Sequence, residues 1–88
     1  MLDSAALAGI TSLTDTELLN LYLSLSPAAR EMAFASTAQA AQITGVSMRT
    51  IQLWIESGAV RAIAIGRKYR VILESLKEHL ASQMNRRV

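Results

Sequence analysis

Basic side chains, which donate hydrogen bonds to anions, gather in one short part of this 88-residue sequence. Residues 47–70 carry a charge of +4, whereas residues 1–46 carry −3 and residues 71–88 carry +1, so the net charge of +2 conceals the asymmetry. The basic residues of the central segment are Arg49, Arg61, Arg67, Lys68 and Arg70. Such clustering raises the local potential and favours a polyanionic partner, although a solvated basic surface is the alternative.

Other kinds of chemistry find little support in the residue types. The chain has no cysteine and one histidine, His79, so thiolate and disulfide chemistry is absent and a metal site would depend on carboxylates. The carboxylates are scattered, no serine has a histidine and an acid in a suitable sequence context, and no glycine-rich phosphate loop occurs. We therefore expect no enzyme activity, no cofactor, no metal and no small-molecule effector.

Length and hydropathy suggest one small domain that does not enter a membrane. A chain of this size buries only about 60% of its unfolded surface, so a partner could contribute to its stability. No basic residue precedes the apolar residues near Met1, and the apolar runs are short, which argues against a secretory signal or a membrane span. We expect a soluble cytoplasmic protein.

The first third of the chain contains two helix starts. Thr14 followed by Glu17 has the spacing of a capping box, and the Ser26-Pro27 pair is typical of a second start, with a short helix from residue 27 to about residue 33. Apolar residues cover roughly 200° of the first helix, wider than the single stripe that a surface helix needs. We interpret residues 1–34 as a helical extension packed on the same core.

A helix pair with a tight glycine turn follows. Ser36 with Gln39 indicates a helix from Thr37 to Ile43 that buries Ala40, Ala41 and Ile43, and the Thr44-Gly45 turn ends it. Ser47 then caps a helix that runs to Ser57 and is closed by Gly58. Its buried stripe has the i, i+3, i+4 spacing of Ile51, Trp54 and Ile55. A short turn between two such helices is typical of a helix-turn-helix unit.

The last third predicts a hairpin and a closing helix. Strand-forming runs lie on either side of Gly66-Arg67, so residues 60–72 read as a β-hairpin with basic residues at or after its tip. From Leu73 onward, Leu76, Leu80 and Met84 recur at helical spacing. We expect the tail, residues 85–88, to be frayed.

The segment from about Ala35 to Leu80 resembles the helix-turn-helix domain of the excisionase and MerR-like families, a small winged-helix fold. The resemblance depends on the order of Ser36-Thr37-x-x-Ala40-Ala41, Gly45-Val46-Ser47, Arg49-Thr50-Ile51, Trp54-Ile55, Gly58 and Gly66-Arg67-Lys68-Tyr69-Arg70-Val71. It implies a mainly α fold with a small β-hairpin, and divides the chain into the extension 1–34 and a winged helix-turn-helix domain, 35–88.

By this resemblance, helix 47–57 enters the major groove of double-stranded DNA and the wing at 66–70 approaches the backbone. Arg49 can pair with guanine and Gln52 with adenine, while Met48 or Leu53 can contact a thymine methyl group. The hydroxyls of the two helix starts suit phosphate oxygens. The expected DNA-binding residues are Ser36, Thr37, Ser47, Met48, Arg49, Thr50, Gln52, Leu53, Arg67, Lys68, Tyr69 and Arg70.

A sequence-specific DNA-binding protein is therefore the first hypothesis, as a transcriptional regulator or as an excisionase-like accessory factor in DNA recombination. It would be nucleoid-associated in a bacterium, phage or plasmid. One small domain reads few base pairs, so we expect a dimer or a side-by-side array on DNA. The expected oligomerisation residues are Leu18, Leu19, Leu21, Tyr22 and Leu25. Leu53 departs from the polar or basic residue usual in the family, and the alternative hypothesis is a protein–protein adaptor that reuses the fold.

Overall fold

The structure, a computed structural model, describes residues 9–85 and is mainly helical, with 66% helix and one small sheet. The extension begins with a 3-10 helix η1 (Ile10–Ser12), followed by α2 (Asp15–Ser24) and α3 (Pro27–Ala33). The helix-turn-helix pair is α4 (Thr37–Thr44) and α5 (Met48–Ser57), and α6 (Leu73–Asn85) closes the described part of the chain. The winged helix-turn-helix fold expected from the sequence is confirmed. The expectation of a frayed tail falls almost wholly outside the described residues.

The sheet has three strands, one more than the sequence predicted. The hairpin of β2 (Ala62–Ile65) and β3 (Lys68–Ile72) is joined on its other side by β1 (Phe34–Ser36), so the order is β1-β3-β2 with antiparallel pairing throughout. Ser36 lies opposite Arg70 in this register. Sequence reasoning missed β1 because it is a single three-residue strand between two helix signals, too short to show an alternation of its own.

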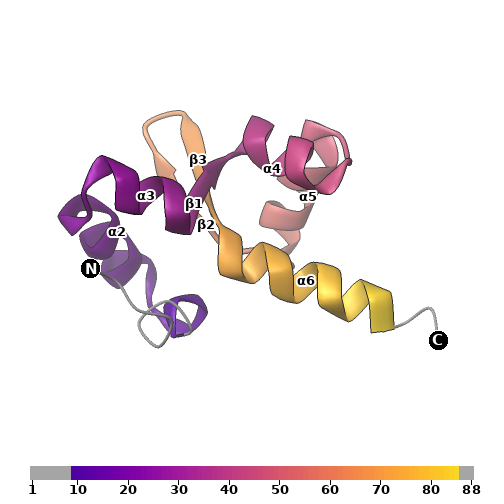
Figure 1. The fold of residues 1–88 in the computed structure, drawn as a ribbon, viewed down its shortest axis with the longest axis horizontal. Coiled ribbons are helices and arrows are strands. Elements are labelled where there is room, and N and C mark those ends of the chain that lie inside the picture. Colours follow the sequence, from indigo (N-terminus) through magenta and orange to yellow (C-terminus); the bar gives the residue numbers. More distant parts are fainter. Residues whose placement is uncertain (1–8, 86–88) are drawn as a thin grey trace.

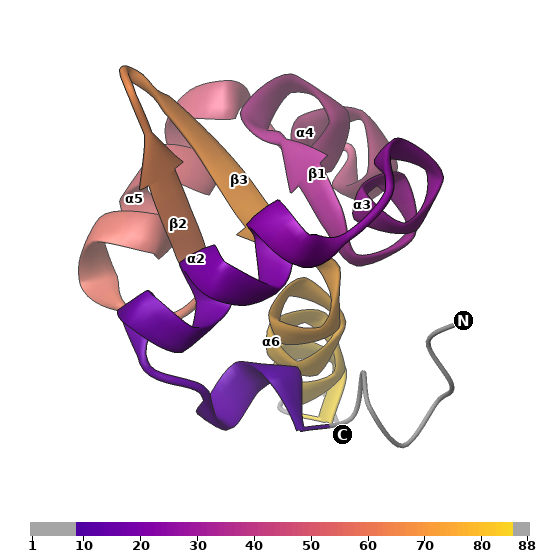
Figure 2. The same cartoon turned by 90° about the vertical axis from the view of Figure 1, so that its left-hand side faces the viewer.

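The two faces of the sheet carry two different cores. Successive side chains of a strand point to opposite faces, so Val71 and Ile72 face opposite sides. Ile72 joins the extension in one buried cluster, with Ile10, Leu18, Ala33, Phe34 and Ile63. Val71 joins the helix-turn-helix in the other, with Ala40, Ile51, Val60 and Leu76. Figure 2 shows this arrangement, with α2 crossing in front of the sheet and α5 behind it.

Capping residues fix where the helices begin and end. Thr14 and Glu17 form the expected capping box, since Thr14 N donates to Glu17 Oε1 at 2.9 Å and Glu17 N donates to Thr14 Oγ1 at 3.2 Å. Gly45 ends α4 with a φ of 78°, in the left-handed region that favours glycine. Figure 1 shows the compact turn between α4 and α5 that follows, with α6 passing below both helices.

Two sequence predictions about burial are wrong. Ile43 was expected in the core beside Ala40, but its side chain is 64% exposed, whereas Ala40 is 0% exposed as expected. Ile43 lies at the rim of an apolar groove that also contains Met32 of α3 and Leu80 of α6. Leu18 was expected at an oligomer interface, but it is 0% exposed within the core that the extension shares with the sheet. It therefore has no surface to offer to a second chain.

The other residues predicted for oligomerisation differ in how much surface they leave. Leu21, Tyr22 and Leu25 are half-buried and pack against the first core, whereas Leu19 is 39% exposed. Leu23, which completes the apolar surface of α2, is 61% exposed. The wide apolar surface of α2 thus has its principal neighbour within its own chain, and oligomerisation stays a prediction.

Candidate nucleic-acid interface

The start of α4, the outer face of α5 and the wing surround one groove. Eight of the twelve predicted DNA-binding residues line this groove, which has a volume of about 440 Å³. We call it the basic groove. Its lining residues are Ser36, Thr37, Ala38, Met48, Gln52, Arg67, Lys68, Tyr69 and Arg70. Three of them are basic, all from the wing, and none is acidic, so the wing faces the uncharged residues of α4 and α5 with a local concentration of positive charge.

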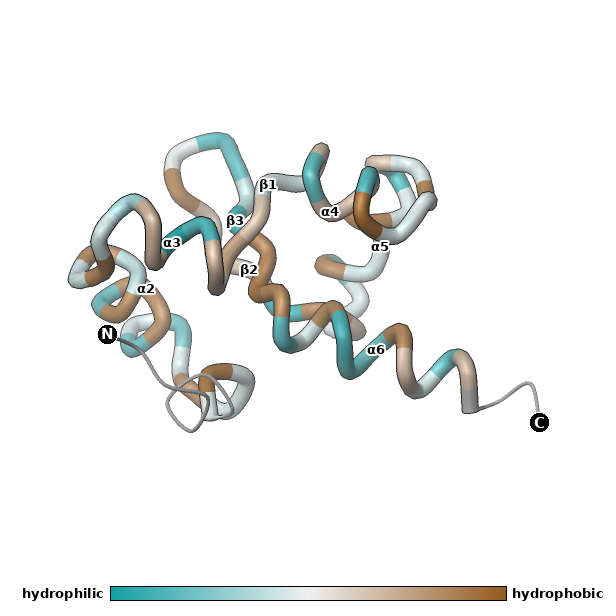
Figure 3. Tube along the Cα trace, in the orientation of Figure 1, coloured by the Kyte–Doolittle hydropathy of each residue, from teal (hydrophilic) through white to brown (hydrophobic). Residues whose placement is uncertain are grey.

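The wing tip follows from a two-residue turn. Ile65 pairs with Lys68, so Gly66 and Arg67 alone connect the strands. Gly66 has a φ of 64°, and no residue other than glycine has a positive φ in the described part of the chain, which matches the type II′ pattern of glycine at the first turn position. Arg67 and Lys68 are exposed, whereas Tyr69 and Arg70 are half-buried closer to the body. Figure 3 shows hydrophilic residues at this tip beside a hydrophobic strand base.

The buried side of α5 fixes which side chains face outward. Ile51 is 0% exposed, and Trp54 and Ile55 pack against the second core, as the sequence predicted. The flank of α5 beside this buried side presents Met48 and Gln52, one helical turn apart, toward the wing. Trp54 also meets His79 of α6 edge-on, with ring centroids 4.6 Å apart, and His79 is half-buried.

The four remaining predicted residues lie on α5 or at its cap but do not line the basic groove. Arg49 is exposed and Leu53 is 51% exposed, on the helix stripe next to Met48 and Gln52. Ser47 Oγ accepts a hydrogen bond from Thr50 N at 3.1 Å and lies 3.0 Å from Thr50 Oγ1. These two hydroxyls therefore satisfy each other first, and one proton of the pair remains for an outside acceptor.

Ser36 has a clearer capacity to donate. Its Oγ accepts from Gln39 N at 3.1 Å, and its backbone N donates to Gln39 Oε1 at 3.0 Å, so the two residues form a capping box at the predicted helix start. The hydroxyl proton of Ser36 takes no part in either bond. It can donate to an anion at the start of α4.

Arg61, counted in the basic segment of the sequence, does not belong to this surface. Its Nη2 lies 2.6 Å from Asp15 Oδ1, and its Nη1 donates to the carbonyl oxygens of Thr11 and Leu13. Arg61 thus ties the extension to the start of β2. Nothing in the sequence signalled this role, since the partners are 46 to 50 residues away.

Comparison with known families identifies the domain. The family model described as "Helix-turn-helix domain" matches residues 36–84, more than half of the chain. The chain belongs to this helix-turn-helix family. The match supports an excisionase-like DNA-binding domain, while the MerR-like part of the resemblance stays a prediction. No curated protein and no solved structure matches the chain.

Two further features of the helix-turn-helix domain protein bear on its chemistry. Among residues 9–85, no helix is long and apolar enough to cross a membrane. Within the same residues, no group of three or more histidines and carboxylates could hold a metal ion.

Proposed function

We propose that this helix-turn-helix protein binds double-stranded DNA in a sequence-specific manner, as a transcriptional regulator or as an excisionase-like accessory factor. The observation that carries the proposal is the basic groove, where Arg67, Lys68 and Arg70 of the wing face the start of α4 and one side of α5 with no acidic residue in the lining. An α-helix with side chains is about 10–12 Å wide and the major groove of DNA about 12 Å, so α5 fits the groove.

Base reading is assigned to the outward stripe of α5. Arg49 donates bidentately to guanine O6 and N7, and Gln52 pairs with adenine N6 and N7, each worth about 1–3 kcal/mol of discrimination. Met48 is 50% exposed and suits contact with a thymine methyl group, as does Leu53. These side chains lie near the start of α5 or one turn later, which is the part of a recognition helix that meets base edges.

Backbone contacts are assigned to the wing and to the starts of α4 and α5. Arg67, Lys68 and Arg70 of the wing neutralise phosphates, and Tyr69 donates its hydroxyl or supports the wing. Ser36, Thr37, Ser47 and Thr50 contribute hydroxyls and helix N-terminal amides. With about four basic contacts per chain, the affinity of one copy for a specific site is limited. We therefore propose that copies cooperate on DNA as a homo-oligomer. The exposed apolar side chains of Leu19 and Leu23 on α2 would contact the second copy.

Salt dependence tests the proposal directly. Each neutralised phosphate contributes about 0.9 to the slope of log affinity against log salt concentration. Lys68→Ala should lower this slope by about 0.9, because it removes one groove cation, whereas Lys77→Ala, an exposed lysine on α6, should leave it unchanged. Equal slopes for the wild type and both variants would contradict the assignment of the wing.

An adaptor function is the second candidate, because Met48 and Leu53 expose apolar surface on α5. Apolar docking to another protein would weaken little as salt rises, so the same titration separates the two hypotheses. In either case we propose a non-enzymatic, cytoplasmic protein without cofactor, membrane partner or small-molecule effector.

A further inference from the structure

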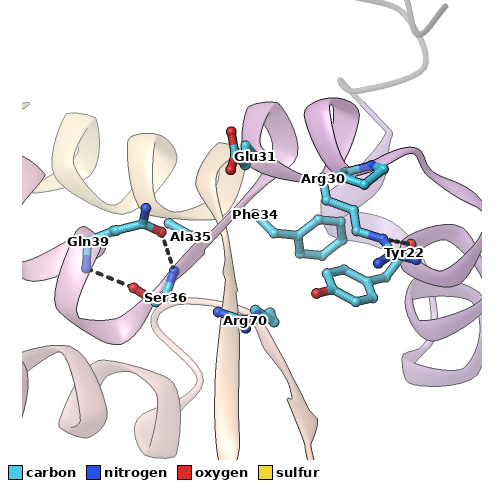
Figure 4. A pocket seen from close by; sticks show the side chains of 9 residues that line it. Tyr22, Arg30, Glu31, Phe34, Ala35, Ser36, Gln39 and Arg70 are labelled. Atoms are coloured by element: carbon cyan, nitrogen blue, oxygen red, sulfur yellow. Dashed lines mark hydrogen bonds between the residues drawn. The ribbon is translucent and has the colours of Figure 1, made fainter.

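A second hollow adjoins the basic groove on the side of the N-terminal extension. It has a volume of about 310 Å³ and lies between α3, the β1–α4 junction and β3 (Figure 4). Ser36 and Arg70 line both the hollow and the basic groove, so the two depressions adjoin at these residues. The other lining residues are Tyr22, Pro27, Arg30, Glu31, Phe34, Ala35 and Gln39. We call this depression the flanking hollow.

One wall of the flanking hollow holds an arginine in a fixed position. Arg30 Nε donates to Tyr22 O at 2.8 Å, and Arg30 Nη2 donates to Leu23 O at 3.3 Å. The guanidinium also lies 4.6 Å from the centroid of the Tyr22 ring, which in turn meets Phe34 edge-on at 5.1 Å. Arg30 is therefore pre-organised, and Nη1 takes no part in a hydrogen bond within residues 9–85.

The opposite wall presents further donors. Gln39 Oε1 accepts from Ser36 N, which fixes the side-chain amide so that its Nε2 remains a donor without a protein acceptor among the described residues. Arg70 enters from β3, and Figure 4 shows the Tyr22 hydroxyl directed toward the side of the hollow where Arg70 lies. Donors from four elements thus converge on one depression, and the single acid there is the exposed Glu31.

We propose that the flanking hollow binds a backbone phosphate of the same DNA duplex that occupies the basic groove, so that the extension is part of the DNA-binding surface. The inference depends on the proposed function and adds Arg30, Gln39 and Tyr22 to it. Convergent arginines, an amide and a hydroxyl suit a phosphate, and the residues shared with the basic groove favour the DNA backbone over a free anion. Glu31 at the edge of the hollow opposes the phosphate charge and lowers the affinity.

Glu31 supplies a test that leaves the fixed arginine intact. Glu31→Lys removes the opposing charge and offers a new cation, so the slope of log affinity against log salt should steepen by about 0.9 and binding at low salt should tighten severalfold. Glu78→Lys, at an exposed position on α6, changes the net charge equally and is the matched control. It should leave the slope as in the wild type.

Hydroxyl-radical footprinting of the same complexes locates the contact. The Glu31→Lys protein should strengthen backbone protection on one flank of the wild-type footprint. Equal effects of the two lysine variants would show a net-charge effect and contradict the inference, as would an unchanged footprint. If inorganic phosphate alone bound in the hollow, and the slope of log DNA affinity against log salt concentration were the same for Glu31→Lys and the wild type, the hollow would be a free-phosphate site. That result would also overturn the inference. Absence of any DNA binding by the wild type would refute the proposed function itself.

Discussion

The guanidinium of Arg61 lies 2.6 Å from the carboxylate of Asp15, and this contact joins the start of β2 to the start of α2. The same guanidinium donates to the carbonyl oxygens of Thr11 and Leu13, which precede α2. Arg61 thereby fixes the connection between η1 and α2. The extension then lies where Leu18 can cover the face of the sheet that carries Ile72.

Separate removal of the two partners should distinguish the ion pair from the carbonyl bonds. The Asp15 side chain is 90% exposed, so Asp15→Asn should lower the free energy of unfolding by less than about 1 kcal/mol. Arg61→Ala should cost about 2 kcal/mol, because it also removes charge-assisted hydrogen bonds to two carbonyl oxygens. Urea unfolding of both variants measures the difference. Equal costs would contradict the dominant role of the carbonyl bonds.

The capping box of α2 should give the protein an acid-sensitive element. Glu17 forms hydrogen bonds with Thr14 that hold the pKa of Glu17 below its ordinary value. The bond to the backbone N of Thr14 has the larger effect, and the bond to the Thr14 side chain has the smaller one. A carboxyl group with a lowered folded-state pKa stabilises the fold above its unfolded pKa of about 4.3, and this stability is lost as the pH falls through the folded-state pKa.

Glu17→Gln removes this titration but keeps an oxygen that accepts from Thr14 N. The urea midpoint of the variant should therefore fall less than that of the wild type between pH 6 and pH 3. Parallel decreases in the two proteins would mean that Glu17 does not contribute to the acid sensitivity.

The turn between α4 and α5 should be sensitive to loss of its glycine. Gly45 has a φ of 78°, and a Cβ at this position would meet nothing within 4 Å, so Gly45→Ala should cost only the backbone strain of about 1–2 kcal/mol. Gly9 has a φ of −90° and equally open surroundings, so Gly9→Ala is the matched control. It should be neutral or stabilise the fold by up to about 1 kcal/mol. Thermal unfolding of the two variants compares them, and a Gly45→Ala protein as stable as the wild type would refute the strain.

Local signals in the sequence predicted most of the fold. Both capping boxes and the glycine turn depend on residues within four positions of each other, so spacing alone identifies them. The paired strands around Gly66-Arg67 are local in the same sense. Local spacing does not place Arg67, Lys68 and Arg70 beside Met48 and Gln52. The resemblance to the helix-turn-helix family predicted that placement, because it implied a fold in which the wing lies beside α5.

Long-range partners account for what the sequence did not reveal. The β1 strand exists only because Phe34–Ser36 pairs with β3, which lies far along the chain. Phe34 pairs with Ile72, 38 positions later, and Ser36 with Arg70, 34 positions later. Arg61 looked like one more cation until its partners in the extension were known. The flanking hollow likewise needs Arg30, Gln39 and Arg70 together, and no spacing rule relates these three residues.

Base reading by Arg49 is the central claim, and selection from randomised duplexes at several salt concentrations tests it most directly. The wild type should recover a sequence motif that Arg49→Ala relaxes at a guanine position, with a loss of about 1–3 kcal/mol of discrimination there. The orientation of repeated motifs would distinguish a symmetric dimer from a head-to-tail array. Recovery of the same motif, equally sharp, by the Arg49→Ala protein would contradict base reading by Arg49.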